Sequence, residues 1–199
     1  MRESLKLLAH ALATVAVVPA LLSYRLRTWA IGPDRALAGS TQAFSLVPGL
    51  IGQYLRRAFL CQVLDACHRS VTIEFGTLFS AAGARLGERA YIGPGCHFGL
   101  VELGADVLIG AGVHIPSGAR AHAISDSAVP IREQPFVRSR IRVGEGSWIG
   151  SAAVIMADVG SNSIVGSGAV VTKPIPDRVV AAGVPARVLK ARDPGQSPR

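Results

Sequence analysis

Residues 143–190 read VGEGSWIGSAAVIMADVGSNSIVGSGAVVTKPIPDRVVAAGVPARVLK, and an aliphatic residue followed by a small one recurs in this stretch at short steps. The pattern begins after about residue 71, and most steps are six residues long. It is carried by Leu86-Gly87, Ile92-Gly93, Phe98-Gly99, Leu103-Gly104, Ile109-Gly110, Val143-Gly144, Ile149-Gly150, Val165-Gly166 and Val171-Thr172. A fixed short period indicates a solenoid, in which one structural unit repeats and stacks.

The six-residue period predicts a parallel β-helix. Each unit supplies one short strand and one corner, its aliphatic residue points inward, and the small neighbour permits the tight corner. Three units would form a triangular coil, and stacked coils bury one continuous column of aliphatic side chains. The stretch from Met156 to Val165 is two residues shorter than two regular units, so we expect one corner of that coil to differ.

These motifs resemble the hexapeptide-repeat acyltransferases, whose fold is a left-handed parallel β-helix. The resemblance covers residues 71–190, and the ending VVTKPIP…AAGVPARVLK is similar to the branch that acetylates sugars, antibiotics and polysaccharides. The upstream segment SLVPGLIGQYLRRAF resembles the region that precedes the β-helix in the branch linked to exopolysaccharide synthesis. The resemblance implies a mainly β fold of about four to five triangular coils, with N-terminal helices and a short C-terminal helix.

The chain divides into four regions. We expect a hydrophobic, membrane-anchoring or membrane-associated helix in residues 1–30, and a linker with an amphipathic helix in residues 31–70. Residues 71–184 form the predicted β-helix domain, from which a loop at 120–141 is extruded. Residues 185–199 are the expected C-terminal helix and a disordered tail.

The N-terminal region contains a nearly continuous apolar run from Leu7 to Leu22, flanked by basic residues on both sides. A helix over this run would be roughly 24 Å long, which is shorter than the ~30 Å hydrocarbon core of a bilayer. A membrane anchor or half-inserted helix is favoured, because flanking cations suit an anionic leaflet. A buried core helix and a cleaved signal peptide are the alternatives.

A second helix is predicted between residues 47 and 66, with Pro48 near its start. Its apolar residues recur at three- and four-residue steps, and Arg56 and Arg57 lie off that face. The expected apolar face consists of Leu50, Tyr54, Leu55, Phe59, Val63 and Ala66. This face could lie on lipid or cap the core of the following domain.

The composition excludes several classes of protein. Hydrophobic residues make up 49% of the chain and charged residues 17%, which excludes wholesale disorder. The net charge of +8 suits phosphorylated cofactors and anionic lipid. Aromatic residues are only 6%, too few for a base-stacking surface, so we expect no nucleic-acid partner. The three cysteines have no CxxC spacing, which predicts neither a disulfide framework nor a zinc site.

The loop at 120–141 interrupts the repeat and contains the candidate catalytic residues. Acyl transfer to a hydroxyl needs a base that accepts the hydroxyl proton, and histidine titrates in the right range. By resemblance the catalytic histidine follows the end of a coil, which identifies His122 as the general base. Asp126, four residues later, is the candidate that would orient the imidazole.

The resemblance also implies acetyl-CoA as the acyl-donor substrate, and no metal. Ser151 and Ser167 correspond to backbone contacts along the pantetheine arm, and Trp148 packs beside the site. His97 is expected to line the acceptor cleft. The basic end of the coenzyme site is assigned to Thr172, Lys173, Arg187 and Lys190.

The predicted function is acetyl transfer from coenzyme A to a hydroxyl of a saccharide, in polysaccharide or glycolipid biosynthesis. The expected assembly is a homotrimer on the cytoplasmic face of a bacterial inner membrane, held peripherally or by a single anchor. Two alternatives come from other classes. A zinc carbonic anhydrase of the same fold would need His97, His114 and His122 on one metal, and a membrane-docked scaffold would bind no coenzyme A.

Overall fold

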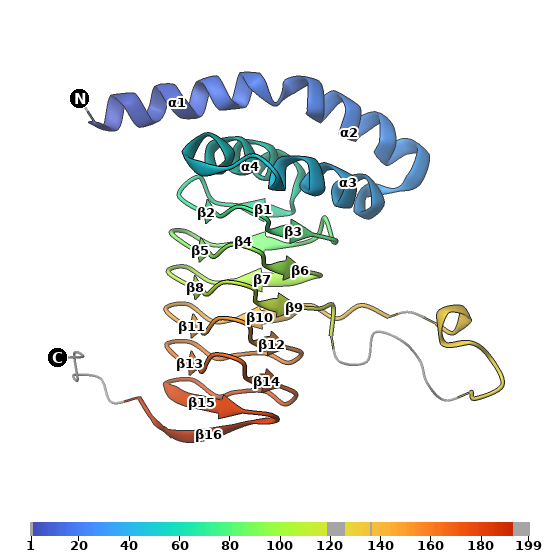
Figure 1. Cartoon of the computed structure of the whole chain (residues 1–199), viewed down its shortest axis with the longest axis vertical. Coiled ribbons are helices and arrows are strands. Elements are labelled where there is room, and N and C mark those ends of the chain that lie inside the picture. Colours follow the sequence, from blue (N-terminus) through green and yellow to red (C-terminus); the bar gives the residue numbers. More distant parts are fainter. Residues whose placement is uncertain (1, 119–125, 136, 193–199) are drawn as a thin grey trace.

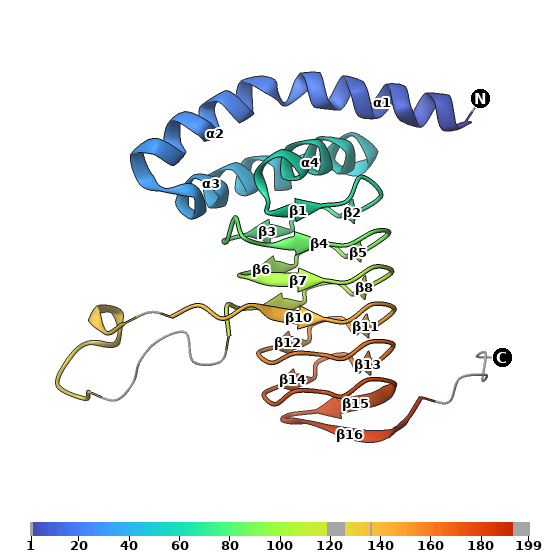
Figure 2. The ribbon, with the colours of Figure 1, turned by 180° about the vertical axis from the view of Figure 1, so that it is seen from behind.

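A computed structural model of the 199-residue chain describes residues 2–118, 126–135 and 137–192. These residues form two layers, with four helices lying across one end of a tall prism of short strands (Figure 1). The view from behind shows the same stack, with the C-terminal strands at the end farthest from the helices (Figure 2). The prism is a parallel β-helix, as the repeat predicts, and it is left-handed, as the resemblance implies.

Three sheets form the sides of the prism, and we name their outer surfaces face A, face B and face C. Face A contains β1 (Ala66–Cys67), β4 (Arg85–Leu86), β7 (Val101–Leu103) and β10 (Ile141–Val143). Face B contains β2 (Thr72–Ile73), β5 (Tyr91–Ile92), β8 (Leu108–Ile109), β11 (Trp148–Ile149), β13 (Ile164–Val165), β15 (Val179–Gly183) and β16 (Ala186–Ala191). Face C contains β3 (Leu78–Phe79), β6 (His97–Phe98), β9 (His114–Ile115), β12 (Val154–Ile155) and β14 (Val170–Val171).

The coils shorten along the prism. On face B, Thr72 pairs with Tyr91, 19 residues on, and Tyr91 with Leu108, 17 residues on. After the loop, Trp148 pairs with Ile164, a step of 16 residues, which confirms the shortened stretch between Met156 and Val165. The prism has about six turns, so the prediction of four to five was too low. The first turn begins at β1, before the aliphatic–glycine pattern becomes regular.

The interior of the prism is a column of aliphatic side chains. On face B, Ile92, Ile109, Ile149 and Val165 are all fully buried, and each pairs with the next along the stack. The glycine after each of these residues lets one coil approach the next. A Cβ at Gly150 would lie 2.4 Å from the backbone nitrogen of Ser167, which is closer than real atoms approach.

The predicted C-terminal helix is wrong: residues 186–191 form strand β16. The chain reverses after β15, with Gly183 at a φ of +101°, and β16 pairs antiparallel with β15. A helix of six residues is unstable on its own. The same residues form backbone hydrogen bonds with the free edge of β15 when they are extended, which explains the strand. The predicted tail, 193–199, lies outside the described residues.

The helical layer consists of α1 (Arg2–Ala16), α2 (Val18–Ile31), α3 (Pro33–Ser45) and α4 (Gly49–Val63). Helices α1 and α2 follow one another with a bend of 46°. Pro19, in the first turn of α2, has no backbone N–H to donate across this break. Residues 33–45 form α3 in place of the expected linker. Among the described residues no single helix is long and apolar enough to cross a membrane, although α1 and α2 together pass that test by length and composition.

Helix α4 covers the end of the prism with only part of the predicted apolar face, since Phe59 is fully buried but Leu50 is not. Arg56 is only 2% exposed, while Leu50 is 70% exposed. The Arg56 guanidinium donates to the carbonyl oxygens of Ile73 (2.9 Å), Phe44 (3.1 Å) and Val47 (2.7 Å). These carbonyls end neighbouring segments and need donors, so a buried cation satisfies what an apolar side chain could not.

Candidate active site

The extruded loop connects β9 to β10, and its described residues 126–135 lie away from the side of the prism (Figure 1). Its returning strand is fixed at the base: the amide of Ser139 donates to the carbonyl oxygen of Ser117 at 2.9 Å. Arg138 pairs with Asp34 in the first turn of α3, and the other oxygen of that carboxylate accepts the amide N–H of Ala82 at 2.9 Å. The base of the loop is therefore connected to the helical layer.

Of the two candidate catalytic residues, the structure describes only Asp126. His122 lies outside the described residues. Asp126 is exposed, and its Oδ1 accepts the amide N–H of Ala128 at 2.9 Å. Gln134, which follows the short helix η1 (Ile131–Glu133), is buried and donates to the carbonyl oxygens of Asp126 (2.6 Å) and Val129 (2.8 Å). In the described part of the loop, Asp126 therefore stabilises a turn.

Two of the predicted coenzyme-binding residues lie together on the edge where faces B and C meet, which we call the B–C edge. Ser151 follows β11 and Ser167 follows β13, so the two occupy the same corner on neighbouring coils. Both are exposed. Neither backbone N–H donates a hydrogen bond to another described residue, although the neighbouring amides of Ala152 and Gly168 both do. The edge thus presents two unused amide donors about 4.8 Å apart.

Of the four remaining predicted coenzyme residues, only Arg187 lies on this edge, at its C-terminal end. Ala182 stacks on Gly166 of the edge and pairs across the hairpin with Arg187, so Arg187 continues the line of Ser151 and Ser167. Thr172 and Lys173 follow β14 and lie at the other end of face C, while Lys190 pairs with Val180 at the other end of β15. All four are exposed. Arg187 is therefore the basic residue best placed to meet an anionic group on the B–C edge.

The two predicted acceptor residues point outward from different faces. His97 is on β6 of face C, and Trp148, 47% exposed, is on β11 of face B. The structure pairs His97 with His114 on β9, their ring centroids 5.8 Å apart. Burial and the neighbouring His97 lower the pKa of His114. The 17-residue spacing of the two histidines is one coil, which is the sequence signal that could have predicted this pair.

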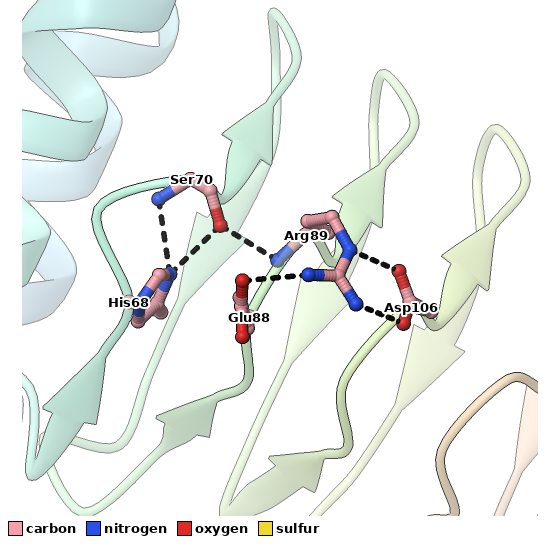
Figure 3. Close-up of polar contacts among 5 residues, drawn as sticks. All are labelled: His68, Ser70, Glu88, Arg89 and Asp106. Carbon is pink, nitrogen blue, oxygen red and sulfur yellow. Dashed lines mark hydrogen bonds and ion pairs between the residues drawn. The ribbon is translucent and has the colours of Figure 1, made fainter.

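The A–B edge is different, because its side chains already bind one another (Figure 3). Arg89 donates through Nε and Nη2 to the two carboxylate oxygens of Asp106, each at 2.6 Å, and pairs with Glu88. Its backbone N–H donates to Ser70, which contacts His68. Intrachain contacts thus occupy the side chains of Glu88, Arg89 and Asp106 on this edge. The backbone N–H groups of Ala105 and Glu145, on the same edge, donate to no other described residue, as is the case for Ser151 and Ser167.

Metal ligation has little support in the part of the chain that the structure describes. There, no group of three or more histidine, cysteine, aspartate or glutamate side chains could hold a metal ion. His97 and His114 are adjacent, and the third imidazole of the carbonic anhydrase alternative, His122, is not described.

The left-handed β-helix of this chain is similar to the fold of known acetyltransferases. The chain is 29% identical over 168 residues to the galactoside O-acetyltransferase of Escherichia coli, which covers 71% of this chain and 80% of that enzyme. It is 34% identical over 94 residues to a Mycobacterium tuberculosis protein described as an acetyltransferase, a match that spans 46% of this chain and only 31% of that protein.

The chain is also similar in structure to an enzyme that was solved with coenzyme A bound. A galactoside acetyltransferase in complex with coenzyme A superposes with a TM-score of 0.66 and 25% identity, over 87% of this chain and 82% of that one. No protein-family model matches the chain. The homologues and structural neighbours are acetyltransferases, and this chain is similar to them in sequence and in fold.

Proposed function

We propose that the protein transfers an acetyl group from acetyl-CoA to a hydroxyl of a saccharide, with His122 as general base. The observation that carries the proposal is the B–C edge, where Ser151 and Ser167 are exposed residues one coil apart whose backbone N–H groups donate to no other described residue. The pantetheine arm of coenzyme A contains amide carbonyls that accept such donors, and Arg187 continues the line toward a phosphate-bearing end. The coenzyme A complex of a galactoside acetyltransferase supports the same donor.

The chemistry needs little from the protein beyond positioning and proton transfer. The acceptor oxygen attacks the thioester carbon, the imidazole of His122 takes the hydroxyl proton, and the coenzyme A thiolate leaves. Because the thioester is already activated, a covalent acyl-enzyme is not required. The developing oxyanion needs a hydrogen-bond donor, for which a backbone N–H is the commonest solution.

The test combines calorimetry of acetyl-CoA binding with free-thiol release in the presence of a panel of saccharides. His122→Ala should bind acetyl-CoA as the native protein does and lose about 10²–10⁴-fold in kcat, the usual contribution of a general base. The control is His68→Ala, because His68 lies on the A–B edge and contacts Ser70. The absence of acetyl-CoA binding by the native protein would overturn the assignment.

We also propose that the protein is a homotrimer. The support is the difference in charge between face A and the other two faces of the prism. On strands β5, β8, β11 and β13 of face B the outward residues are uncharged, whereas β16 at the end of that face carries Arg187 and Lys190. Tyr91, Leu108 and Trp148 are 38%, 43% and 47% exposed. The outward residues of face C are uncharged aliphatics and the His97–His114 pair, whereas face A carries Arg85, Glu102 and Arg142. If face B of each copy contacts face C of the next, three prisms form a closed ring around a three-fold axis.

Light scattering after gel filtration in mild detergent tests the trimer. Leu108→Glu places a charge in the centre of face B and should yield monomers, since a buried unpaired carboxylate costs several kcal/mol. Arg85→Glu, on face A, should leave the mass unchanged. A native protein that is monomeric at micromolar concentration would contradict the proposal.

The acceptor is proposed to be a membrane-bound glycan of polysaccharide or glycolipid synthesis, with the enzyme on the cytoplasmic face of a bacterial inner membrane. Helices α1 and α2 support it: Ala13, Val17 and Tyr24 are buried toward α4, so the helices lie flat on the molecule. Their other side exposes large apolar residues, with Leu12, Leu22, Leu26 and Trp29 between 61% and 88% exposed. Such a surface, with Arg25 exposed beside it, suits insertion into one anionic leaflet.

Vesicle flotation tests the membrane role. Replacing Leu26 and Trp29 together by glutamate should reduce binding to vesicles of phosphatidylglycerol and phosphatidylethanolamine by at least tenfold. Leu189→Glu is the matched control, because Leu189 is 64% exposed but lies on β16 at the far end of the prism. Equal binding by the native protein and the double variant would exclude this surface.

A further inference from the structure

Two cysteine thiols meet where the helical layer joins the prism. Cys61 lies in the last turn of α4 and Cys67 in β1, and their Sγ atoms are 2.9 Å apart. Both are free and half-buried. The chain turns between them at Leu64 and Asp65, so a pair without any CxxC spacing is brought together by the fold.

The thiols line a cavity between α1 and α4. Its volume is about 440 Å³, and its lining includes His10 and Thr14 of α1, Cys61 and Gln62 of α4, and Cys67 and Arg69. The cavity is large enough for a small polar molecule. The third cysteine, Cys96, is fully buried in the prism and donates to the carbonyl oxygen of Gly110 at 3.1 Å, so it has neither a thiol partner nor a comparable approach.

The surroundings of the two thiols are unequal. Donation from the Cys67 S–H, together with the positive charges of Arg57 and Arg69, lowers the pKa of Cys61, although burial opposes this. The pKa of Cys67 is raised, because its proton is held by Cys61 and because the thiol is buried. Thiolate is the reactive form of cysteine, so Cys61 is the thiol prepared for attack.

We propose that Cys61 and Cys67 are a redox-active pair that a small-molecule disulfide, entering through this cavity, oxidises to an intramolecular disulfide. The Cys61 thiolate attacks one sulfur of the small disulfide, forming a mixed disulfide and expelling one small thiolate. Cys67 then gives up its proton and attacks Sγ of Cys61, which expels the second small thiolate. Two protein thiols are oxidised by two electrons, and the small disulfide, with their two protons, becomes two thiols.

The position of the pair gives the modification a structural consequence. The new bond would tie the last turn of α4 to the first strand of the prism, across the joint between the two layers. Because α4 separates α1 from the prism, oxidation should hold the helical layer more firmly in place. The proposal does not depend on the reaction or the acceptor proposed above.

The test uses the full-length protein in mild detergent with oxidised glutathione as the probe. After the remaining thiols are alkylated under denaturing conditions, peptide mass mapping should find Cys61 linked to Cys67 and Cys96 alkylated. The oxidised protein should also show a higher Tm than the reduced protein. Cys96→Ser should react as the native protein does.

Two single variants separate the roles of the thiols, and circular dichroism melting establishes that each variant is folded. Cys67→Ser should stop at a stable mixed disulfide between glutathione and Cys61. Cys61→Ser should react with glutathione at least tenfold more slowly at Cys67. The proposal is overturned if Cys96 is modified while the pair stays reduced, or if both thiols form mixed disulfides without a Cys61–Cys67 link.

Discussion

The prism and the helical layer are held together in opposite ways. In the prism the same contact is repeated: aliphatic residues such as Ile109 and Ile149 stack at full burial, and backbone hydrogen bonds join each coil to the next. The helical layer depends on contacts that occur once, such as the buried guanidinium of Arg56 and the link from Asp34 to Arg138. Repetition spreads stability over many equal contacts, whereas single contacts concentrate it in a few side chains.

The largest effect is expected where a substitution prevents two coils from touching. Gly150→Ala would place a Cβ 2.4 Å from the backbone nitrogen of Ser167, and a backbone atom cannot move aside as a side chain can. We expect a loss of about 3–5 kcal/mol in the free energy of unfolding, measured by urea denaturation at fixed protein concentration.

The control for this substitution lies on the same edge. Gly112 has a φ of +65° and nothing within 4 Å of a Cβ, and Ala152 adopts a φ of 58° at the matching corner of a neighbouring coil. Gly112→Ala should therefore cost only about 1 kcal/mol. Equal losses for the two variants would mean that inter-coil spacing does not govern stability.

Arg56→Met should give the next largest effect, in the helical layer. The substitution keeps an apolar stem but removes the guanidinium that donates to the carbonyl oxygens of Ile73, Phe44 and Val47, of which Phe44 retains a backbone donor, so we expect a loss of about 2–4 kcal/mol in stability. Arg57→Met is the matched control, because Arg57 stacks on Tyr54 with its guanidinium 4.7 Å from the ring centroid, a contact worth about 0.5–1 kcal/mol. Thermal unfolding of the two variants side by side decides whether burial of the cation matters.

Asp34→Asn tests the connection between the two layers. The amide keeps an oxygen for the N–H of Ala82 but weakens the pairing with Arg138, so we expect about 1 kcal/mol of lost stability. Limited trypsin digestion should cleave the 120–141 loop faster than in the native protein. Glu133→Gln, which alters an exposed pair with the adjacent Arg132, should leave the digestion rate unchanged.

The smallest predicted effect is a pH dependence that arises on face C. The pKa of His114 is lowered in the folded protein, so the unfolded chain binds the proton more readily. Stability should therefore be fully present above the ordinary pKa of histidine and should fall as the pH drops through the lowered value. His114→Gln should make the unfolding midpoint less sensitive to pH between about 5 and 7. A profile identical to that of the native protein would show that other groups dominate.

The sequence predicted the prism well because its contacts are periodic, and it predicted the helical layer poorly because its contacts are not. A count of six residues locates Ile149 on the inner side of a strand and Ser151 on a corner. No spacing rule predicts that Arg56 is buried while Leu50 is exposed, since this depends on which carbonyls α4 meets across the joint. The strand β16 was missed for the same reason: its partner, the free edge of β15, exists only once the prism has formed.

In the candidate site, too, the residues placed by the repeat were predictable from the sequence and the others were not. Ser151, Ser167 and Arg187 fall on one edge because corners recur at coil spacing, whereas the separation of His97 and Trp148 onto different faces follows from which side of the triangle each strand occupies. The role of Asp126 in a turn depends on Gln134, a partner that no motif specifies. His122 stays a prediction that rests on resemblance.

The two ends of the prism are closed by different structures. Helix α4 packs Phe59 and Leu60 over the first coil, and β16 crosses the last coil antiparallel to the strand beside it. An open β-helix would present unpaired strands at both ends, which another copy could extend. Since a helix occupies one end, a second copy finds no strand edge there to extend, which opposes growth of the stack into a fibre.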